Sequence, residues 1–159
     1  MQTIIFAAGC FWGVQAYFDQ VPGVEHTTVG YTGGHVANPT YEQVCAHTTG
    51  HAEAVRIEFD PKKVSYGTLL KHFFRMHDPT QLNRQGLDVG DSYRSAIFYT
   101  SDEQKDLAEK AKVEAQAQFD KPVVTEITTA SEFYKAEAYH QKYFEKTGRG
   151  ACHVPYQPL

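Results

Sequence analysis

Three things are scarce in this sequence: cysteine, positive charge and long apolar runs. Its 159 residues carry 15 Lys and Arg against 19 Asp and Glu, a formal net charge of -4, which leaves no basic surface for a phosphate backbone. No apolar run approaches the roughly 20 residues of a membrane span, and the N-terminus has neither a basic region nor a small-residue cleavage site. We therefore expect a cytoplasmic protein that binds neither nucleic acid nor membrane.

The cysteines are three in number and lie far apart, at Cys10, Cys45 and Cys152. An odd, widely spaced set does not form the paired framework of a small secreted domain. This pattern indicates a reducing compartment and reactive thiols rather than structural disulfides.

The length and composition are typical of one globular domain, because 159 residues with 42% hydrophobic residues can bury one substantial core. The spacing of apolar residues and the positions of Gly and Pro predict strands at 2–8, 24–31, 55–59, 95–99 and 123–128. They predict helices at 10–19, 65–76, 101–119 and 137–145, with a short helical turn from residue 40.

The order of these elements predicts an α+β fold, since strands and helices alternate without a strictly repeating unit. We expect a single domain over residues 1–159, built as a two-layer sandwich with a ferredoxin-like core of mixed sheet and helices. Residues 77–92 lack periodicity and are expected to form a functional loop. Residues 147–159 are expected to form an irregular, flexible tail that carries Cys152.

Cys10 is the first candidate nucleophile, because it stands where a predicted strand turns into a helix. Unpaired backbone N–H groups and the positive end of the dipole in the first helical turn favour a thiolate, whose pKa falls to ~3.5–7.5 in such places. Phe11 and Trp12, the chain's single tryptophan, follow directly and could wall a small apolar pocket. The alternative is a buried, inert cysteine beside two core aromatics.

Glu53 has the same strand parity as Val55, Ile57 and Phe59, so the pleat directs its carboxyl towards the apolar face. A carboxyl in such surroundings has a raised pKa and can serve as a proton donor near neutral pH. The alternative is an exposed carboxyl at a fraying strand end.

Other polar candidates lie in loops, which commonly supply site residues on a rigid scaffold. They are Tyr41, Asp88 and Tyr93, although each tyrosine is one of 10 in the chain and could simply pack. Cys152 is placed as a resolving cysteine would be, in a tail able to bring a second thiol to the first, or it is an incidental surface thiol. Cys45 is interpreted more simply as a packing residue.

Four side chains of types that can ligate a metal lie close together in sequence: Cys45, His47, His51 and Glu53. The segment has no paired C-x-x-C and no second cluster of ligands, so zinc is not predicted. Gly33 and Gly34 lack the spacing of a phosphate-binding loop.

Six segments together resemble the peptide methionine sulfoxide reductase A family. They are GCFWG at 9–13, GYTGG at 30–34, NPTYEQV at 38–44, GHAEAV at 50–55, YRSAI at 93–97 and FYKAEAYHQKY at 133–143, all in the family's order.

The resemblance implies a thioredoxin-dependent reduction of methionine S-sulfoxide, free or in proteins, by a monomer without metal or organic cofactor. Thioredoxin, or dithiothreitol in its place, would be the external reductant. It implies that Cys10 attacks the sulfur and becomes a sulfenic acid, which Cys152 resolves as a disulfide. The remaining implied roles are protonation of the sulfoxide oxygen by Glu53, hydrogen bonds to it from Tyr41 and Tyr93, ordering by Asp88, and a methyl pocket of Phe11 and Trp12.

The tail departs from the pattern of many relatives, which carry a second C-terminal cysteine, because only Cys152 is present here. We therefore expect direct regeneration from a Cys10–Cys152 disulfide. Two rival hypotheses remain: a cysteine acyltransferase or hydrolase using His51 or His140 as base, and a non-catalytic module that binds an oxidised or methylated side chain beside Phe11 and Trp12.

Overall fold

The fold was obtained as a computed structural model that describes residues 1–147, 156 and 158–159. Its elements in chain order are β1 (Gln2–Ala8), α1 (Phe11–Phe18), β2 (Val24–Thr32), α2 (Tyr41–Cys45), β3 (Ala52–Phe59), α3 (Tyr66–Met76), β4 (Arg84–Gln85), β5 (Asp88–Val89), η1 (Asp91–Tyr93), β6 (Ser95–Tyr99), α4 (Asp102–Gln116), β7 (Glu126–Thr129), β8 (Tyr134–Lys135), η2 (Ala138–His140) and α5 (Tyr143–Thr147).

A six-stranded mixed sheet in the order β7-β6-β1-β3-β2-β8 forms the centre of the molecule, and only β6 and β7 pair in parallel. Alternation along the strands separates two faces. Ile4, Phe6, Val55 and Ile57 belong to the large core, whereas a smaller cluster on the other face contains Ile5, Ala7, Ala52, Ala54, Ala96 and Phe98. The predicted α+β two-layer sandwich is confirmed.

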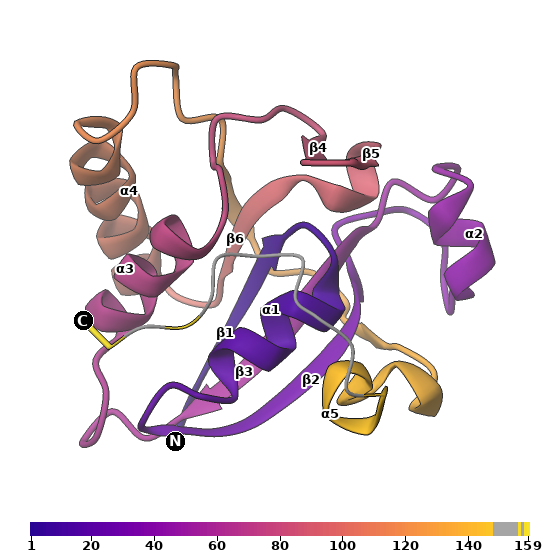
Figure 1. The fold of residues 1–159 in the computed structure, drawn as a ribbon, viewed down its shortest axis with the longest axis horizontal. Helices are drawn as coiled ribbons and strands as arrows, with labels where there is room; N and C mark the ends of the chain where they lie inside the picture. The colour runs from indigo at the N-terminus through magenta and orange to yellow at the C-terminus, as the bar shows by residue number, and fades with distance from the viewer. Residues whose placement is uncertain (148–155, 157) are drawn as a thin grey trace.

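The helices lie on one face of this sheet. The large core joins sheet residues to Phe11, Val14 and Phe18 of α1 and to Leu69 and Phe73 of α3. In Figure 1, α1 crosses in front of the central strands while α3 and α4 lie beside each other at one side. Within the described part of the chain, no helix is both long and apolar enough to span a bilayer.

The predicted segments differ clearly from the structure in three regions. Residues 77–92 were expected to be irregular but contain the β4–β5 hairpin and η1. The single helix expected at 137–145 is instead η2 followed by α5, because Lys142 between them adopts a φ of 58°, which no α-helix accommodates. The strand expected at 123–128 begins only at Glu126.

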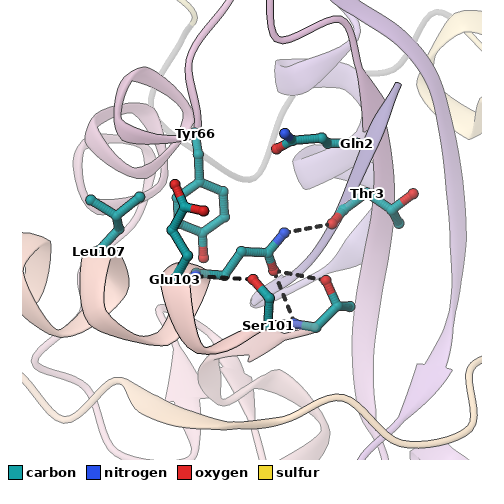
Figure 2. A pocket seen from close by; sticks show the side chains of 8 residues that line it. Gln2, Thr3, Tyr66, Ser101, Glu103 and Leu107 are labelled. Carbon is teal, nitrogen blue, oxygen red and sulfur yellow. Dashed lines mark hydrogen bonds between the residues drawn. The ribbon is translucent and has the colours of Figure 1, made fainter.

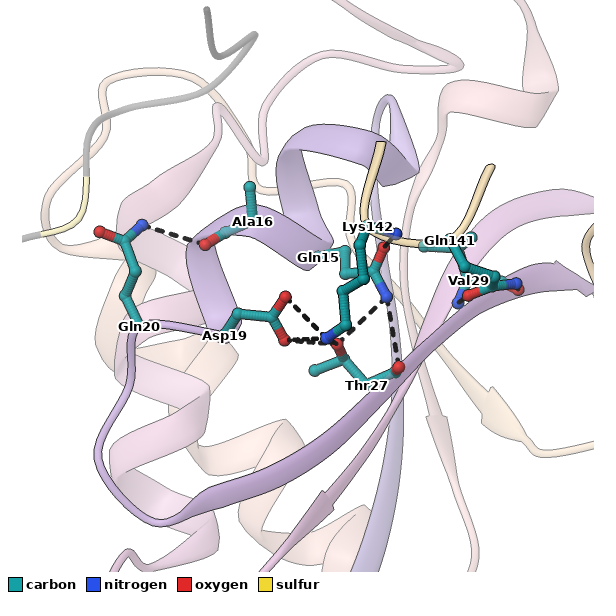
Figure 3. A network of polar contacts seen from close by, with 8 residues as sticks. All are labelled: Gln15, Ala16, Asp19, Gln20, Thr27, Val29, Gln141 and Lys142. Carbon is teal, nitrogen blue, oxygen red and sulfur yellow. Dashed lines mark hydrogen bonds and ion pairs between the residues drawn. The ribbon is translucent and has the colours of Figure 1, made fainter. Parts of the chain in front are cut away.

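A set of polar contacts fixes the segment between η2 and α5 to the helical layer (Figure 3). The Lys142 Nζ donates to the carboxylate of Asp19 at 2.7 and 2.8 Å and to the Thr27 hydroxyl at 2.8 Å. The buried Gln15 amide accepts from Lys142 N at 2.7 Å and donates to Thr27 O at 3.2 Å. We call these four residues the Lys142 cluster.

Candidate active site

Cys10 is the N-cap residue of α1, directly after a sharp turn from β1. Gly9 makes this turn with a φ of 92°, a conformation that glycine adopts without steric cost. The Cys10 carbonyl accepts the first helical bonds, from Gly13 N at 3.2 Å and Val14 N at 3.3 Å. The thiol therefore stands where the helix presents its unpaired N–H groups.

The Glu53 carboxyl lies beside this helix start. Glu53 is 1% exposed and shares the core-facing parity of Val55 on β3. Its Oε1 accepts a hydrogen bond from Phe11 N at 3.2 Å, so the carboxyl is hydrogen-bonded to the residue that follows Cys10. A strand residue and a helix start 42 positions apart thus form one polar site.

Tyr41 and Tyr93 face the same carboxyl from two other elements, the first residue of α2 and the last of η1. Burial raises the pKa of both tyrosines, and the nearby Glu53 charge raises each further. Asp88 and Cys10 also act on Tyr93 electrostatically. Both phenols therefore stay neutral at physiological pH and can donate a hydrogen bond.

Aromatic rings form the apolar side of this site. The Tyr41 ring centroid lies 6.4 Å from that of Phe11 and 6.3 Å from that of Trp12. On its other side, Trp12 stacks on Tyr143 of α5 at 3.8 Å with an interplanar angle of 13°. The two residues after the thiol thus contribute to one aromatic wall, which suits an apolar group such as a methyl.

Neither candidate histidine is suited to be a general base for Cys10. His51 accepts from Gly34 N through Nδ1 at 3.0 Å, and its Nε2 bonds the Val36 carbonyl at 2.7 Å. His140 accepts from Trp12 Nε1 through Nδ1 at 2.9 Å, so a neutral His140 carries its proton on Nε2 and has no acceptor left. Burial also lowers the pKa of His140.

Cys45, interpreted from the sequence as a packing residue, is the last residue of α2 and is partly buried. Its thiol lies close to the side chains of Tyr41 and Tyr93. Burial raises the pKa of this thiol, although the tyrosine contacts partly oppose the shift. Cys45 thus adjoins the site as a neutral thiol. Among the described residues, no group of three or more His, Cys, Asp or Glu side chains is arranged to hold a metal ion.

A second hollow opens at the other end of β1, seven residues long and so about 20 Å from Cys10. Gln2, Thr3, Tyr66, Ser101, Glu103 and Leu107 are among its lining residues (Figure 2). The Gln104 amide closes it by donating to Thr3 O at 3.0 Å and accepting from Thr100 N at 3.0 Å. None of the predicted site residues within the described part of the chain lines this hollow.

Comparison with known proteins decides the family. The sequence profile described as "Peptide methionine sulfoxide reductase" matches residues 2–159. The chain belongs to this family. It is therefore an oxidoreductase that reduces methionine sulfoxide, as its sequence motifs predicted. The alternatives of a cysteine hydrolase and of a non-catalytic module are set aside.

Individual relatives of this reductase agree with that assignment. MsrA of Methanosarcina mazei is 60% identical over 150 residues, which cover 93% of this chain and 71% of that protein. Mxr1 of Saccharomyces cerevisiae in reduced form is 33% identical with a TM-score of 0.90, covering 98% of this chain and 92% of that one. The same yeast protein in complex with Trx2 is 25% identical with a TM-score of 0.68, covering 98% and 90%.

Of the residues expected in the reductase site, the structure brings together Cys10, Glu53, Tyr41 and Tyr93, with Phe11, Trp12 and Asp88 beside them. Cys152 and most of the expected tail lie outside the described residues.

Two residues that adjoin the site were not singled out from the sequence, Tyr31 and Glu137. Tyr31 pairs directly with Glu53 across β2 and β3, and Glu137 accepts hydrogen bonds from Tyr31 and from the backbone of Tyr41. Both belong to the motif segments GYTGG and FYKAEAYHQKY, which is the signal that could have found them.

Proposed function

We propose that this reductase acts on methionine S-sulfoxide through direct attack of the Cys10 thiolate on the sulfoxide sulfur. The sulfoxide oxygen transfers to the Cys10 sulfur, which becomes a sulfenic acid, and methionine leaves. The observation that carries this proposal is the joining of the Cys10 helix start to the buried Glu53 carboxyl through Phe11 N. A nucleophile and a proton donor then lie on the two sides of one bound group.

The acid is needed because an unprotonated sulfoxide oxygen is a poor group to displace. Glu53 is removed from water, and a carboxyl without water holds its proton more readily. In this proposal Glu53 delivers that proton to the oxygen as sulfur accepts the thiolate. The oxygen develops hydroxyl character before it transfers to Cys10.

Tyr41 and Tyr93 bind the same oxygen as hydrogen-bond donors in this proposal. Their raised pKa values keep both hydroxyls protonated, and donors held in place before reaction stabilise developing charge at low cost. Asp88 acts on Tyr93 electrostatically and orders that side of the site. Phe11 and Trp12 hold the substrate methyl group against the aromatic wall.

Regeneration is assigned to Cys152 and thioredoxin. The Cys152 thiol condenses with the Cys10 sulfenic acid, so that a disulfide forms and one water leaves. Thioredoxin then reduces the disulfide by exchange, and dithiothreitol replaces it in vitro. The yeast complex of Mxr1 with Trx2 supports such a partner. The proposed enzyme is a monomer that needs no metal or organic cofactor and accepts free or protein-bound substrate.

The test is to mix reduced enzyme with each methionine sulfoxide epimer without reductant and to count methionine formed and thiols lost. We expect one methionine and two thiols lost per chain for the S epimer only. Methionine formed without loss of thiols would contradict the mechanism.

The Cys152→Ser variant separates the two stages. It should form about one methionine per chain in the first turnover and then stall with thioredoxin, because the sulfenic acid has no resolving thiol. Continued thioredoxin-dependent cycling by this variant would remove Cys152 from the mechanism.

A further inference from the structure

Glu137 connects two tyrosines at the rim of the active site. Its Oε1 accepts from the Tyr31 hydroxyl at 2.8 Å, and its Oε2 accepts from the backbone N–H of Tyr41 at 3.1 Å. These contacts join positions 106 and 96 residues apart in sequence. We call Tyr31, Tyr41 and Glu137 the Glu137 cluster.

We propose that Glu137 is a positioning residue for sulfoxide reduction, which sets the place of the Tyr41 hydroxyl by holding the start of α2 against Tyr31. The inference rests on the proposed function, because it assumes that Tyr41 binds the sulfoxide oxygen. Glu137 itself does not touch the reacting atoms in this proposal.

The contacts require a carboxylate rather than an amide. Each oxygen of Glu137 accepts from a different donor, and a carboxylate offers two acceptor atoms where an amide offers one. Although burial raises the pKa of this carboxyl, hydrogen bonds from the backbone N–H groups of Glu137 and Tyr41 outweigh it, so the net shift is downward. Glu137 is therefore ionised at neutral pH and can accept both bonds.

The position of Tyr41 depends on this contact because α2 is short and peripheral. The helix has five residues, and only Val44 among them is buried. Its capping box between Thr40 and Gln43 is exposed to solvent and gives no fixed point within the core. Glu137 holds α2 in place by its hydrogen bond to the backbone N–H of Tyr41, the residue whose side chain enters the site.

The same contact separates Tyr31 from Glu53. Tyr31 and Glu53 are directly paired across β2 and β3, so their side chains lie on one face of the sheet. The Tyr31 hydroxyl is nevertheless donated to Glu137. Glu137 thus accepts the hydrogen bond of this tyrosine, so the Tyr31 hydroxyl is directed to Glu137 rather than to Glu53.

The first test compares Glu137→Gln with Glu132→Gln in a single turnover of methionine S-sulfoxide. Both remove one charge from the same segment, but the exposed Glu132 side chain forms none of the contacts of the cluster. We expect Glu137→Gln to slow methionine formation about 10-fold, as small misplacements of a binding group do, and Glu132→Gln to react at the wild-type rate. Equal rates for the two variants would overturn the inference.

A second measurement separates positioning from general damage to the site. Alkylation of Cys10 by iodoacetamide needs the thiolate but no oxygen-binding tyrosine, so it should change less than about 2-fold in Glu137→Gln. An equal loss of alkylation and sulfoxide reduction would overturn the inference. If Glu137→Gln does not fold, Tyr31→Phe removes one partner of the carboxylate and should slow reduction about 3-fold with alkylation unchanged.

A double-mutant cycle tests whether Glu137 acts through Tyr41. In a Tyr41→Phe background, Glu137→Gln should slow reduction by less than about 2-fold more, because the hydroxyl that it positions is gone. Independent, multiplicative losses would overturn the inference. If Tyr41→Phe reacts slowly but Glu137→Gln reacts at the wild-type rate, only the inference about Glu137 is overturned. If Tyr41→Phe reacts at the wild-type rate, the proposed role of Tyr41 is overturned as well.

Discussion

Two polar clusters attach the segment 136–142 to the rest of the molecule, and they differ in where their contacts end. The Glu137 cluster ends on Tyr41, whose hydroxyl stands beside Cys45, Glu53 and Tyr93. The Lys142 cluster closes on itself, since Lys142 bonds Asp19, Thr27 and Gln15 in turn (Figure 3).

The comparison shows that similar hydrogen bonds serve different ends depending on what they support. Hydrogen bonds that hold a substrate-binding residue should affect the rate of sulfoxide reduction. Hydrogen bonds whose partners all lie away from the site should affect the free energy of unfolding. The following variants test whether rate and stability separate in this way.

Replacing the nucleophile gives the largest expected effect. Cys10→Ser should lower methionine sulfoxide reduction to the background rate, because a hydroxyl at the helix start is far less nucleophilic than a thiolate. Its thermal unfolding midpoint should stay close to that of the wild type. Residual thioredoxin-dependent turnover in the purified variant would argue against Cys10.

Removing the acid should have the next largest effect on rate. Glu53→Gln keeps the shape of the side chain but has no proton to deliver, so the first turnover should slow by about 10²-fold or more. Stopped-flow measurement of methionine formation checks this. Iodoacetamide alkylation of Cys10 is the control, and a wild-type rate of reduction would contradict the role of Glu53 as acid.

The Lys142 cluster should respond in the opposite way. Gln15→Leu removes the acceptor of Lys142 N and a donor to Thr27 O, so the free energy of unfolding should fall by about 2 kcal/mol. Urea denaturation measures this loss. The first-turnover rate should change less than about 2-fold at a temperature where the variant is folded, and a 10-fold slower reaction would erase the distinction between the clusters.

The smallest expected effect is a pH dependence away from the site, at His72 of α3. Burial, with Arg75 nearby, lowers the pKa of His72 to about 4, and its Nδ1 is paired with the Tyr17 hydroxyl at 2.7 Å. The unfolded chain binds a proton at this histidine below its ordinary pKa of about 6.5, while the folded chain does not.

Stability from His72 is therefore complete above about pH 6.5 and is lost as the pH falls towards 4. Between pH 7 and 5 the loss should be on the order of 1 kcal/mol after solvent screening. Urea denaturation of wild type and His72→Gln at both pH values measures it. An identical pH dependence in the two proteins would contradict this assignment.

Much of the fold could be predicted because it follows from local patterns. Strand β1 and the start of α3 agree with prediction, and Ser65 caps α3 by accepting from Thr68 N. The Ser101 side chain caps α4 by accepting from Gln104 N, but no reciprocal capping box forms, since the Gln104 side chain accepts from Thr100 N. Such detail depends on competing neighbours that a local pattern does not include.

The segment 134–147 was predicted least well, and the reason is tertiary. One helix was expected at 137–145, and just before it β8 forms because Tyr134 and Lys135 pair with the edge of β2. Gln141 then bonds the Val29 backbone, donating to its carbonyl and accepting from its N–H, both at 3.0 Å. A propensity for helix was overridden by a neighbouring strand more than 100 positions away.

Sequence by itself determined the places of Cys10 and Glu53, because a helix start and the parity of a strand follow from residues within a few positions. Only the tertiary structure decided that Tyr41, Tyr93 and Glu137 meet them, since these contacts depend on the strand order and on the packing of loops far apart in the chain. The distances between these residues depend on how the whole core packs, and a local sequence pattern does not contain that information.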